Sequence, residues 1–344
     1  VRQWDLHTGT LGRLYNLKKP VDNVRLSDDG AHIVATALDG DIQVWDRASG
    51  NETHRFGGHR DALITMDLDH RGAFVLTSSR DGSTKKWNLD QRWSTEIIHD
   101  AKAPLAFATI ADNRETLALV TMDGTVKVIR LEDSAVIYTA KIAPVSLGER
   151  LALSPDSTRL ALILDDFLAI VVALDDGHVI SELHGHAGVI RGIQFSPDGS
   201  EIVTASWDQS AYIWDTETGA IKERLTGHGA SVNRALFAPN AQFVATASLD
   251  ATTRLWDHTT ATTVLSIHLS DKSNILAFSP NSDSIATVSR NGKVALWDIA
   301  SQAEIRTLDT GDAMLASMAF SPDGARLLTV SDSGEVYLWD LETG

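Results

Sequence analysis

Residues 196–215 read SPDGSEIVTASWDQSAYIWD, and the order of signals in this stretch recurs along the chain. The SPDG segment predicts a tight turn, because Pro presets φ at the second position and Asp and Gly favour the following positions. The β-branched and apolar run EIVTAS then predicts a strand, and the segment around Asp208 predicts a second turn. The alternating segment AYIWD predicts a further strand that ends at Trp214 and Asp215. The stretch therefore indicates an antiparallel hairpin bounded by turns.

Tryptophan followed by Asp or Asn marks a period of about 42 residues. The first three marked tryptophans are 41 and 42 residues apart, and the last four are 42, 41 and 42 apart. Trp87 and Trp214 are 127 positions apart, which is room for three periods whose Trp positions hold Ile129 and Val172. Seven of the nine tryptophans thus share one register, in the dipeptides Trp4-Asp5, Trp45-Asp46, Trp87-Asn88, Trp214-Asp215, Trp256-Asp257, Trp297-Asp298 and Trp339-Asp340.

Each period carries signals for four antiparallel strands. A turn related to SPDG precedes the apolar strand, an Asp-Gly or related dipeptide follows it, and a last strand comes after a further turn, as in ETGAIKERL at 217–225. No segment keeps a 3.6-residue periodicity over a useful length, so helix is expected to be a minority. Four strands in about 42 residues are typical of a propeller blade. The sequence therefore predicts an all-β propeller of four-stranded antiparallel blades.

The sequence resembles the WD-repeat propeller family over essentially its whole length, on the recurring dipeptide, turns and spacing. Three periods also carry a Gly-His dipeptide, whose His lies 28 residues before the Trp, and a Ser two residues before the turn Asp. The resemblance implies a buried His–Ser–Asp–Trp hydrogen-bond network in these blades. Its predicted members are His59, Ser79, Asp81 and Trp87, then His186, Ser206, Asp208 and Trp214, and finally His228, Ser248, Asp250 and Trp256.

Ser, His and Asp are also the residue types of a hydrolase triad. The structural interpretation is favoured, because the set recurs three times whereas an active site is normally singular. A buried Asp needs donors and an indole N–H needs an acceptor, so the network is intelligible without catalysis. We therefore expect no catalytic residue. The three blades with networks are expected to be the most rigid, and those with Ile129 and Val172 to rely on apolar packing.

Eight Trp positions end eight complete sets of strands, which favours eight blades. Seven blades with one repeat left over is the alternative, since seven is the commonest number in the family. We expect a single propeller domain over 1–344, with repeats ending near residues 46, 88, 130, 173, 215, 257, 298 and 340. Residues 1–9 are interpreted as the remnant of a preceding repeat. The strand near 10–17 is expected to complete the blade containing 314–340, which would remove an exposed edge.

The resemblance also implies a partner-binding face. Its positions flank the first apolar residue of each inner strand or precede the turn Asp. Trp207 lies outside the common Trp register and, together with Arg191, has the composition of an interface hot spot. The alternative is that Trp207 packs on a neighbouring loop. The predicted partner-binding residues are Trp207, Arg191, Val189, Asn233, Ser231, Leu249, Arg80, Ile64 and Arg290.

The composition and charge of the chain disfavour several classes of ligand. Lys and Arg number 30 against 46 Asp and Glu, a net charge of −16, and no basic run supplies a patch for nucleic acid. The apolar stretch 160–174 is too short to cross a membrane and contains Asp165 and Asp166. The absence of cysteine excludes thiolate metal sites and fits a cytoplasmic location. His184 and His186 lack a completing ligand, so no metal or cofactor is expected.

These features predict a non-catalytic interaction scaffold or sensor module of a larger signalling or regulatory protein, with protein or peptide partners. Similar cysteine-poor, SPDG-rich arrays are frequent in bacterial multidomain proteins, so the resemblance implies a bacterial-type array and an effector domain in the same full-length chain. The alternative is a propeller enzyme or a small-molecule-binding propeller that uses the central channel. That function needs one convergent polar cluster at the channel mouth.

Overall fold

The structure is a computed structural model that describes residues 2–5, 10–14, 21–27, 30–37, 39–68, 73–89, 95–100, 103–111, 113, 115–142, 150–270, 275–289, 292–309, 315–331 and 336–341. These residues form strands and turns, and none of them is in a helix. Among them there is accordingly no helix long and apolar enough to span a bilayer. The strands fall into two compact units. The central unit is Ala103–Asn274, and the terminal unit combines Val1–Lys102 with Ile275–Gly344.

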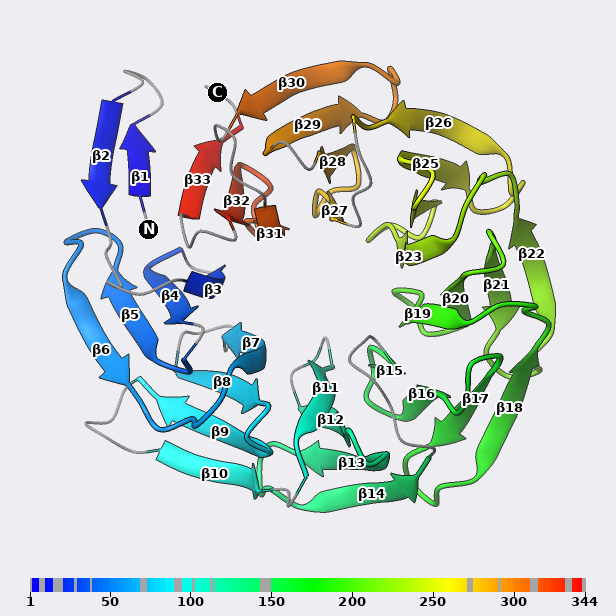
Figure 1. Ribbon diagram of the computed structural model, residues 1–344, viewed down its shortest axis with the longest axis horizontal. Helices are drawn as coiled ribbons and strands as arrows, with labels where there is room; N and C mark the ends of the chain where they lie inside the picture. Colours follow the sequence, from blue (N-terminus) through cyan, green and yellow to red (C-terminus); the bar gives the residue numbers. More distant parts are fainter. Residues whose placement is uncertain are drawn as a thin grey trace. The chain divides into compact units, whose positions relative to one another are not determined.

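The central unit contains four sheets, each of four antiparallel strands in chain order. Figure 1 shows β11, β15, β19 and β23 at the inner side of this unit and β14, β18, β22 and β26 at its outer side. The strands are β11 (Leu105–Ile110), β12 (Thr116–Thr121), β13 (Thr125–Arg130), β14 (Val136–Lys141), β15 (Leu151–Leu153), β16 (Arg159–Ile163), β17 (Leu168–Ala173), β18 (Val179–His184), β19 (Ile190–Phe195), β20 (Glu201–Ser206), β21 (Ala211–Asp215), β22 (Ile221–Leu225), β23 (Val232–Phe237), β24 (Phe243–Ser248), β25 (Thr252–Asp257) and β26 (Thr263–His268).

The terminal unit contains three sheets of four strands and one of five. Its strands are β1 (Arg2–Asp5), β2 (Thr10–Leu14), β3 (Val21–Leu26), β4 (His32–Ala37), β5 (Ile42–Asp46), β6 (Glu52–Phe56), β7 (Leu63–Leu68), β8 (Phe74–Ser79), β9 (Ser83–Asn88), β10 (Thr95–Asp100), β27 (Leu276–Phe278), β28 (Ser284–Val288), β29 (Lys293–Asp298), β30 (Glu304–Asp309), β31 (Leu315–Phe320), β32 (Arg326–Ser331) and β33 (Val336–Asp340). Over the described residues the two units thus hold eight sheets. The prediction of eight four-stranded blades rather than seven is confirmed.

Burial within a blade decreases from its second strand to its outer strand. Every residue of β20 is buried, whereas β22 alternates between half-buried and exposed positions and only its last residue, Leu225, is buried. The second and third strands are covered on both faces by neighbouring blades, which explains their nearly continuous apolar sequences. One core cluster combines Val203 and Ile213 of the β19–β22 blade with Phe237 and Trp256 of the β23–β26 blade. Packing between consecutive blades therefore forms the core of the unit.

A β-bulge recurs near the start of several inner strands. In β19 the pairing with β20 shifts between Ile190 and Gly192, so Arg191 lies at the irregularity. The same shift places Asn233 at the bulge of β23 and Ile64 at that of β7. A bulge bends the strand and re-aims the extra side chain. Three residues predicted for the partner-binding face thus occupy one repeated backbone irregularity.

The terminal hairpin differs from the predicted arrangement. We expected the strand near 10–17 to complete the blade at 314–340 directly, but β1 lies between β2 and β33. β1 pairs with β33 in parallel, through Arg2↔Tyr337 and Gln3↔Leu338, and with β2 in antiparallel. A local hairpin has a smaller loop-closure cost than pairing across the length of the chain, and this favours the β1–β2 pair. The origin of residues 1–9 in a preceding repeat stays a prediction.

Candidate functional site

A chain of hydrogen bonds crosses the β19–β22 blade. Nδ1 of His186 lies 2.7 Å from Oδ2 of Asp208, and Nε2 of His186 lies 2.7 Å from Oγ1 of Thr204. The indole N–H of Trp214 donates to the same Thr204 oxygen at 2.8 Å. The side chain of His186 is fully buried. This chain therefore connects the turn after β20 with the interior of the blade.

Two further blades repeat these contacts with little change. The His-to-Asp distance is 3.2 Å in the β7–β10 blade and 2.9 Å in the β23–β26 blade. In the same two blades, the His-to-Thr distances are 2.8 and 2.7 Å, and the Trp-to-Thr distances are 2.7 and 2.8 Å. The members are Trp87, Thr77, His59 and Asp81 in the first, and Trp256, Thr246, His228 and Asp250 in the second.

The prediction that Ser79, Ser206 and Ser248 are the hydroxyl members of these networks is wrong. The hydroxyl of Ser206 donates to the carbonyl of Gly188 at 2.9 Å, and its oxygen accepts the backbone N–H of Asp208. Ser79 and Ser248 make the corresponding bonds. The serine and the threonine lie on the same face of the strand, two residues apart, but only the threonine lies level with both the imidazole and the indole. The serine instead ties the loop before the inner strand to the turn after the second strand.

The donors in the network assign its proton positions. The Trp214 N–H occupies one acceptor site of Thr204, so the Thr204 hydroxyl is free to donate to Nε2 of His186. Nδ1 of His186 then carries the hydrogen that Asp208 accepts. Burial lowers the pKa of His186 despite the opposing effect of Asp208, and His59 and His228 shift in the same direction for the same reason. The imidazoles are therefore neutral members of a structural network.

The turn aspartates are held ionised by hydrogen bonds. Burial alone would raise the pKa of Asp81, but bonds from the Ser83 hydroxyl and from the backbone N–H groups of Arg60 and Ser83 lower it to about 2. Asp208 likewise accepts the backbone N–H of Ala187, across the loop before β19. In the three networks the serine bonds to backbone and the histidine side chain is fully buried. The predicted serines therefore do not contact the imidazoles. Ser83 does lie 3.1 Å from Nδ1 of His59, but its hydroxyl donates to Asp81 and the imidazole beside it is buried, so this contact lacks the substrate access that a hydrolase needs.

The blades without a network differ at the same positions. Ile129 and Val172 occupy the Trp positions of their blades and are fully buried, and Val172 belongs to an apolar cluster with Val128 and Leu160. Trp339 donates its indole N–H to Thr329 at 3.0 Å. Among the described residues, no partner accepts the buried indole N–H of Trp297. A Trp at this position is therefore not sufficient for the hydrogen-bond network to form.

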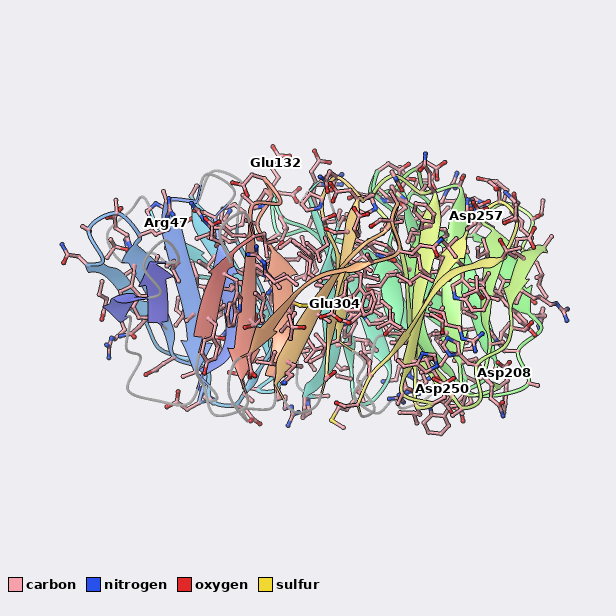
Figure 2. The ribbon with its side chains drawn as sticks, turned by 90° about the horizontal axis from the view of Figure 1, so that it is seen from above. Arg47, Glu132, Asp208, Asp250, Asp257 and Glu304 are labelled. Carbon is pink, nitrogen blue, oxygen red and sulfur yellow. The ribbon has the colours of Figure 1, made fainter. Side chains whose placement is uncertain are left out.

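The turn aspartates identify one edge of the central unit. Figure 2 shows Asp208 and Asp250 together at one edge, and Glu132 and Asp257 at the opposite edge. Trp207 immediately precedes Asp208, and its side chain is 48% exposed. Its backbone N–H donates to the carbonyl of Val189 at 2.9 Å, so the turn is fixed to the loop before β19. An exposed indole thus stands on a backbone that the buried network holds in place.

Trp207 contacts both its own blade and the next one. The guanidinium of Arg191 lies over the indole, 5.3 Å from the ring centroid. The indole N–H donates to Oδ1 of Asn233 at 3.2 Å, and the Ser231 hydroxyl lies 3.5 Å from the carbonyl oxygen of Trp207. Leu249 donates its backbone N–H to the carbonyl of Ser231. The structure therefore brings together six predicted face residues: Trp207, Arg191, Val189, Asn233, Ser231 and Leu249.

The other three predicted face residues are not part of this group. Arg80 and Ile64 belong to the terminal unit, where the Arg80 N–H donates to the carbonyl of Ala62 at 2.9 Å and Ile64 occupies the bulge of β7. Arg290 lies outside the described residues. The candidate site is consequently built from the central unit alone.

The sequence analysis missed a second group of residues on this edge. The β16–β17 turn carries Asp166 and Phe167, and the carbonyl of Asp166 accepts the backbone N–H of Ile190 at 2.8 Å. Phe167 is 51% exposed. A guanidinium nitrogen of Arg150 lies 3.8 Å from Oδ1 of Asp166. Repeat positions could not have found Arg150, because it corresponds in register to Gly192 rather than to Arg191.

The described residues offer no built metal site. His184 bonds to Glu182 and His186 to Asp208, so the two histidines do not converge. One group of three potential ligands has its ligand atoms within 4.8 Å of one another, namely Asp175, Asp176 and His178. All three are exposed, and Nδ1 of His178 lies 2.5 Å from Oδ1 of Asp176. These contacts satisfy the cluster internally.

A hollow of about 200 Å³ lies against the inner strands of the central unit. Most of the residues around it are apolar, among them Phe107, Leu153 and Phe195, although polar atoms contribute the larger part of its surface. Gln194 and Arg234 are the longest polar side chains in the lining. No acid–base pair is present among the described lining residues. This hollow therefore gives no particular support to a channel enzyme.

Comparison with known proteins places the chain in a family. The family described as "IFT122 first beta-propeller" matches residues 149–344, which is more than half of the chain. The chain belongs to this propeller family. The description "WD domain, G-beta repeat" matches residues 11–46 and 50–88. The family assignment thus agrees with the WD repeats that the Trp period predicted.

Curated relatives of this propeller are similar over parts of their length. Autophagy-related protein 16 of Arabidopsis thaliana is 26% identical over 100 residues, covering 28% of this chain and 20% of the relative. The SIR4-interacting protein SIF2 of Saccharomyces cerevisiae is 24% identical and covers 35% and 22%. The COMPASS component SWD3 of the same yeast is 24% identical and covers 42% and 48%. The aligned segments span between a fifth and about half of these relatives, all of which are eukaryotic.

Solved structures show the same fold over nearly the whole chain. The C-terminal WD40 domain of Sif2 superimposes with a TM-score of 0.78 at 14% identity, covering 96% of this chain and 99% of that domain. The computationally designed Ika8 protein gives a TM-score of 0.77 at 18% identity, covering 95% and 98%. The fold is therefore an all-β WD-repeat propeller of eight blades, seven of four strands and one that β1 and β2 extend to five strands over the described residues.

Proposed function

We propose that this chain is a non-catalytic scaffold that binds a protein or peptide partner through one edge of its central unit. This edge, which carries Trp207, Arg191 and Asn233, is called the Trp207 edge below. The observation that carries the proposal is an exposed indole whose backbone is fixed by the Val189 carbonyl and by the network below it. A rigid aromatic anchor beside an arginine is typical of interface hot spots. The order of the supporting backbone reduces the entropy lost on binding.

The composition and the relatives support the same class of partner. A net charge of −16 disfavours a nucleic-acid backbone as the ligand. The printed names of two relatives, a SIR4-interacting protein and a COMPASS component, describe proteins that interact with or belong to an assembly. A partner in a protein complex is the corresponding proposal for this chain.

The proposal extends to the location of the protein and to the domains that accompany the propeller. A cytoplasmic signalling or regulatory protein, with an effector domain in the same full-length chain, agrees with the absence of cysteine and with an array that matches only part of each relative. A bacterial-type array stays a prediction from the SPDG-rich repeats, while the named relatives come from plants and fungi.

The test is a selection from a random peptide-display library on the purified chain, followed by affinity measurements on the enriched peptides. Trp207→Ser is expected to weaken binding by at least about tenfold, because hot-spot anchors dominate interface affinity. Val179→Ser is the matched control, since Val179 is 50% exposed on the outer strand β18. Peptides that bind both variants as tightly as the parent chain would contradict the proposed face.

A further inference from the structure

Two arginines approach the Trp207 edge from neighbouring blades. Arg150 precedes β15, and its side chain is only 10% exposed. Arg191 occupies the bulge of β19 and stacks on the indole of Trp207. Asp166 connects them, because its carboxylate faces Arg150 while its carbonyl accepts the N–H of Ile190, next to Arg191. Burial lowers the pKa of Arg150, the charge of Asp166 opposes this shift, and the nearby charge of Arg191 adds to it.

The charges of this group do not balance among the described residues. The carboxylate of Asp166 lies at the long distance of 3.8 Å from a guanidinium nitrogen of Arg150 and is 56% exposed. The described residues offer Arg191 no ion pair, since its guanidinium lies over the ring of Trp207. Two other acidic groups of this region are engaged elsewhere: Asp165 accepts the backbone N–H groups of Phe167 and Leu168 in its own turn, and Asp208 is bound by His186 and by the N–H of Ala187. In a chain with a net charge of −16, the two guanidiniums thus form a local positive site beside the exposed side chains of Trp207 and Phe167. A largely buried guanidinium gains most from a ligand that brings a full negative charge.

We infer that Arg150 and Arg191 together bind the carboxylate of an acidic residue in a partner peptide, whose adjacent apolar side chain lies on Trp207 and Phe167. Asp166 positions Arg150 for this contact, and Trp207 positions Arg191 by stacking. A guanidinium held over an aromatic ring keeps its N–H edge free for a carboxylate, which it can bind in a bidentate manner. The peptide is therefore an acidic one with a neighbouring aliphatic or aromatic residue.

This inference rests on the proposed function, and the experiment separates the two. Peptides enriched on the purified chain are resynthesised with each Asp or Glu replaced by Asn or Gln, and affinities are measured for the parent chain and for Arg191→Gln. We expect one acidic position whose neutralisation weakens binding by about tenfold or more. Arg191→Gln is expected to give a similar loss with the acidic peptide, and little further loss with the neutral one. Affinity for the acidic peptide is expected to fall as salt concentration rises.

The controls address folding and nonspecific charge. Arg130→Gln removes a surface arginine that is 47% exposed at the end of β13. It lies two residues before Glu132, which Figure 2 shows at the opposite edge of the central unit. Arg150→Lys keeps the buried charge but removes the planar fork, so weaker binding without lower stability supports the clamp.

The two failures are distinguishable. Peptides that depend on Trp207 but bind equally well when neutralised would overturn the carboxylate clamp and leave the binding face standing. Enriched peptides whose affinity is unchanged by both Trp207→Ser and Arg191→Gln would overturn the proposed face as well. Equal losses of affinity in Arg191→Gln and Arg130→Gln would mean that the peptide responds only to the overall charge of the chain, and this would also overturn the clamp.

Discussion

Thr204 satisfies two buried groups with one hydroxyl. Thr204→Val keeps the shape of the side chain but leaves Nε2 of His186 and the indole N–H of Trp214 without their partner. An unsatisfied buried polar group costs about 1–3 kcal/mol, so we expect the free energy of unfolding to fall by about 2–4 kcal/mol for the pair. Denaturant unfolding followed by circular dichroism measures this loss.

Thr287 provides the matched control, because it also lies ten residues before a Trp and is fully buried. Its hydroxyl makes one long bond, 3.5 Å to the carbonyl of Ala295, and Trp297 does not donate to it. Thr287→Val is therefore expected to change stability by less than about 0.5 kcal/mol. Equal losses for the two variants would show that the hydroxyl of Thr204 has no special role.

The same residues show what the sequence can and cannot predict at this scale. The His, Asp and Trp members were predictable because each recurs at a fixed spacing within the period. The hydroxyl member was not, because Thr204 and Ser206 share one face of β20 and alternation cannot say which reaches the imidazole. In the structure, Ser206 lies at the level of Gly188 and bonds to its carbonyl, whereas Thr204 lies deeper in the blade and contacts His186.

At the scale of elements, the loop before β19 approaches the turn after β20 very closely. A β-carbon at Gly188 would lie 2.5 Å from the backbone nitrogen of Asp208 and 2.9 Å from the carbonyl carbon of Trp207. Because both contacts are to backbone, Gly188→Ala has to displace the turn that carries Trp207. We expect a loss of about 1–3 kcal/mol in the free energy of unfolding, the usual cost of overpacking, together with weaker peptide binding. Thermal unfolding and peptide affinity measure the two effects.

Gly229, in the corresponding loop of the next blade, is the control. A β-carbon there would meet Asp250 no closer than 3.8 Å, which is ordinary contact. Gly229→Ala is therefore expected to be neutral or slightly stabilising, since alanine restricts the unfolded chain. A Gly188→Ala variant as stable as Gly229→Ala would mean that the loop and the turn are not in close contact.

The elements also differ in how far the sequence predicts them. The third strands end at Asp46, Asn88, Arg130, Ala173, Asp215, Asp257, Asp298 and Asp340, and turn residues next to an alternating apolar run are enough to place such ends. The bulge that aims Arg191 was not predictable, because a register shift depends on the facing strand. The position of β1 was not predictable for the same reason, since its partner β33 lies at the other end of the sequence.

At the scale of the whole molecule, the period in the tryptophans was sufficient to predict the number of blades. The binding edge was predictable where it follows repeated positions, as with Trp207, Arg191 and Asn233. Arg150 and Asp166 were missed because their relation to Arg191 arises only when neighbouring blades pack together. The period of the sequence therefore predicts the repeats, but it does not predict the side-chain contacts between one repeat and the next.

The three networks also give the molecule a common response to pH. Burial lowers the pKa of His59, His186 and His228, whereas in the unfolded chain these groups titrate near about 6.5. Below that value the unfolded chain binds more protons than the folded chain, so stability is present above it and is lost as the pH falls toward the lowered value. Each histidine contributes up to about 1.4 kcal/mol per pH unit in this window. The network aspartates also have lowered pKa values, but their contribution is lost only at more acidic pH, toward about 2 for Asp81.

We expect the Tm to fall as the pH decreases from about 7.5 to about 5.5. His228→Asn should reduce that slope. His178→Asn should not, because the exposed His178 has a pKa raised by its hydrogen bond to Asp176 and acts in the opposite direction. An unchanged slope in His228→Asn would mean that the buried imidazoles do not control the acid sensitivity of the fold.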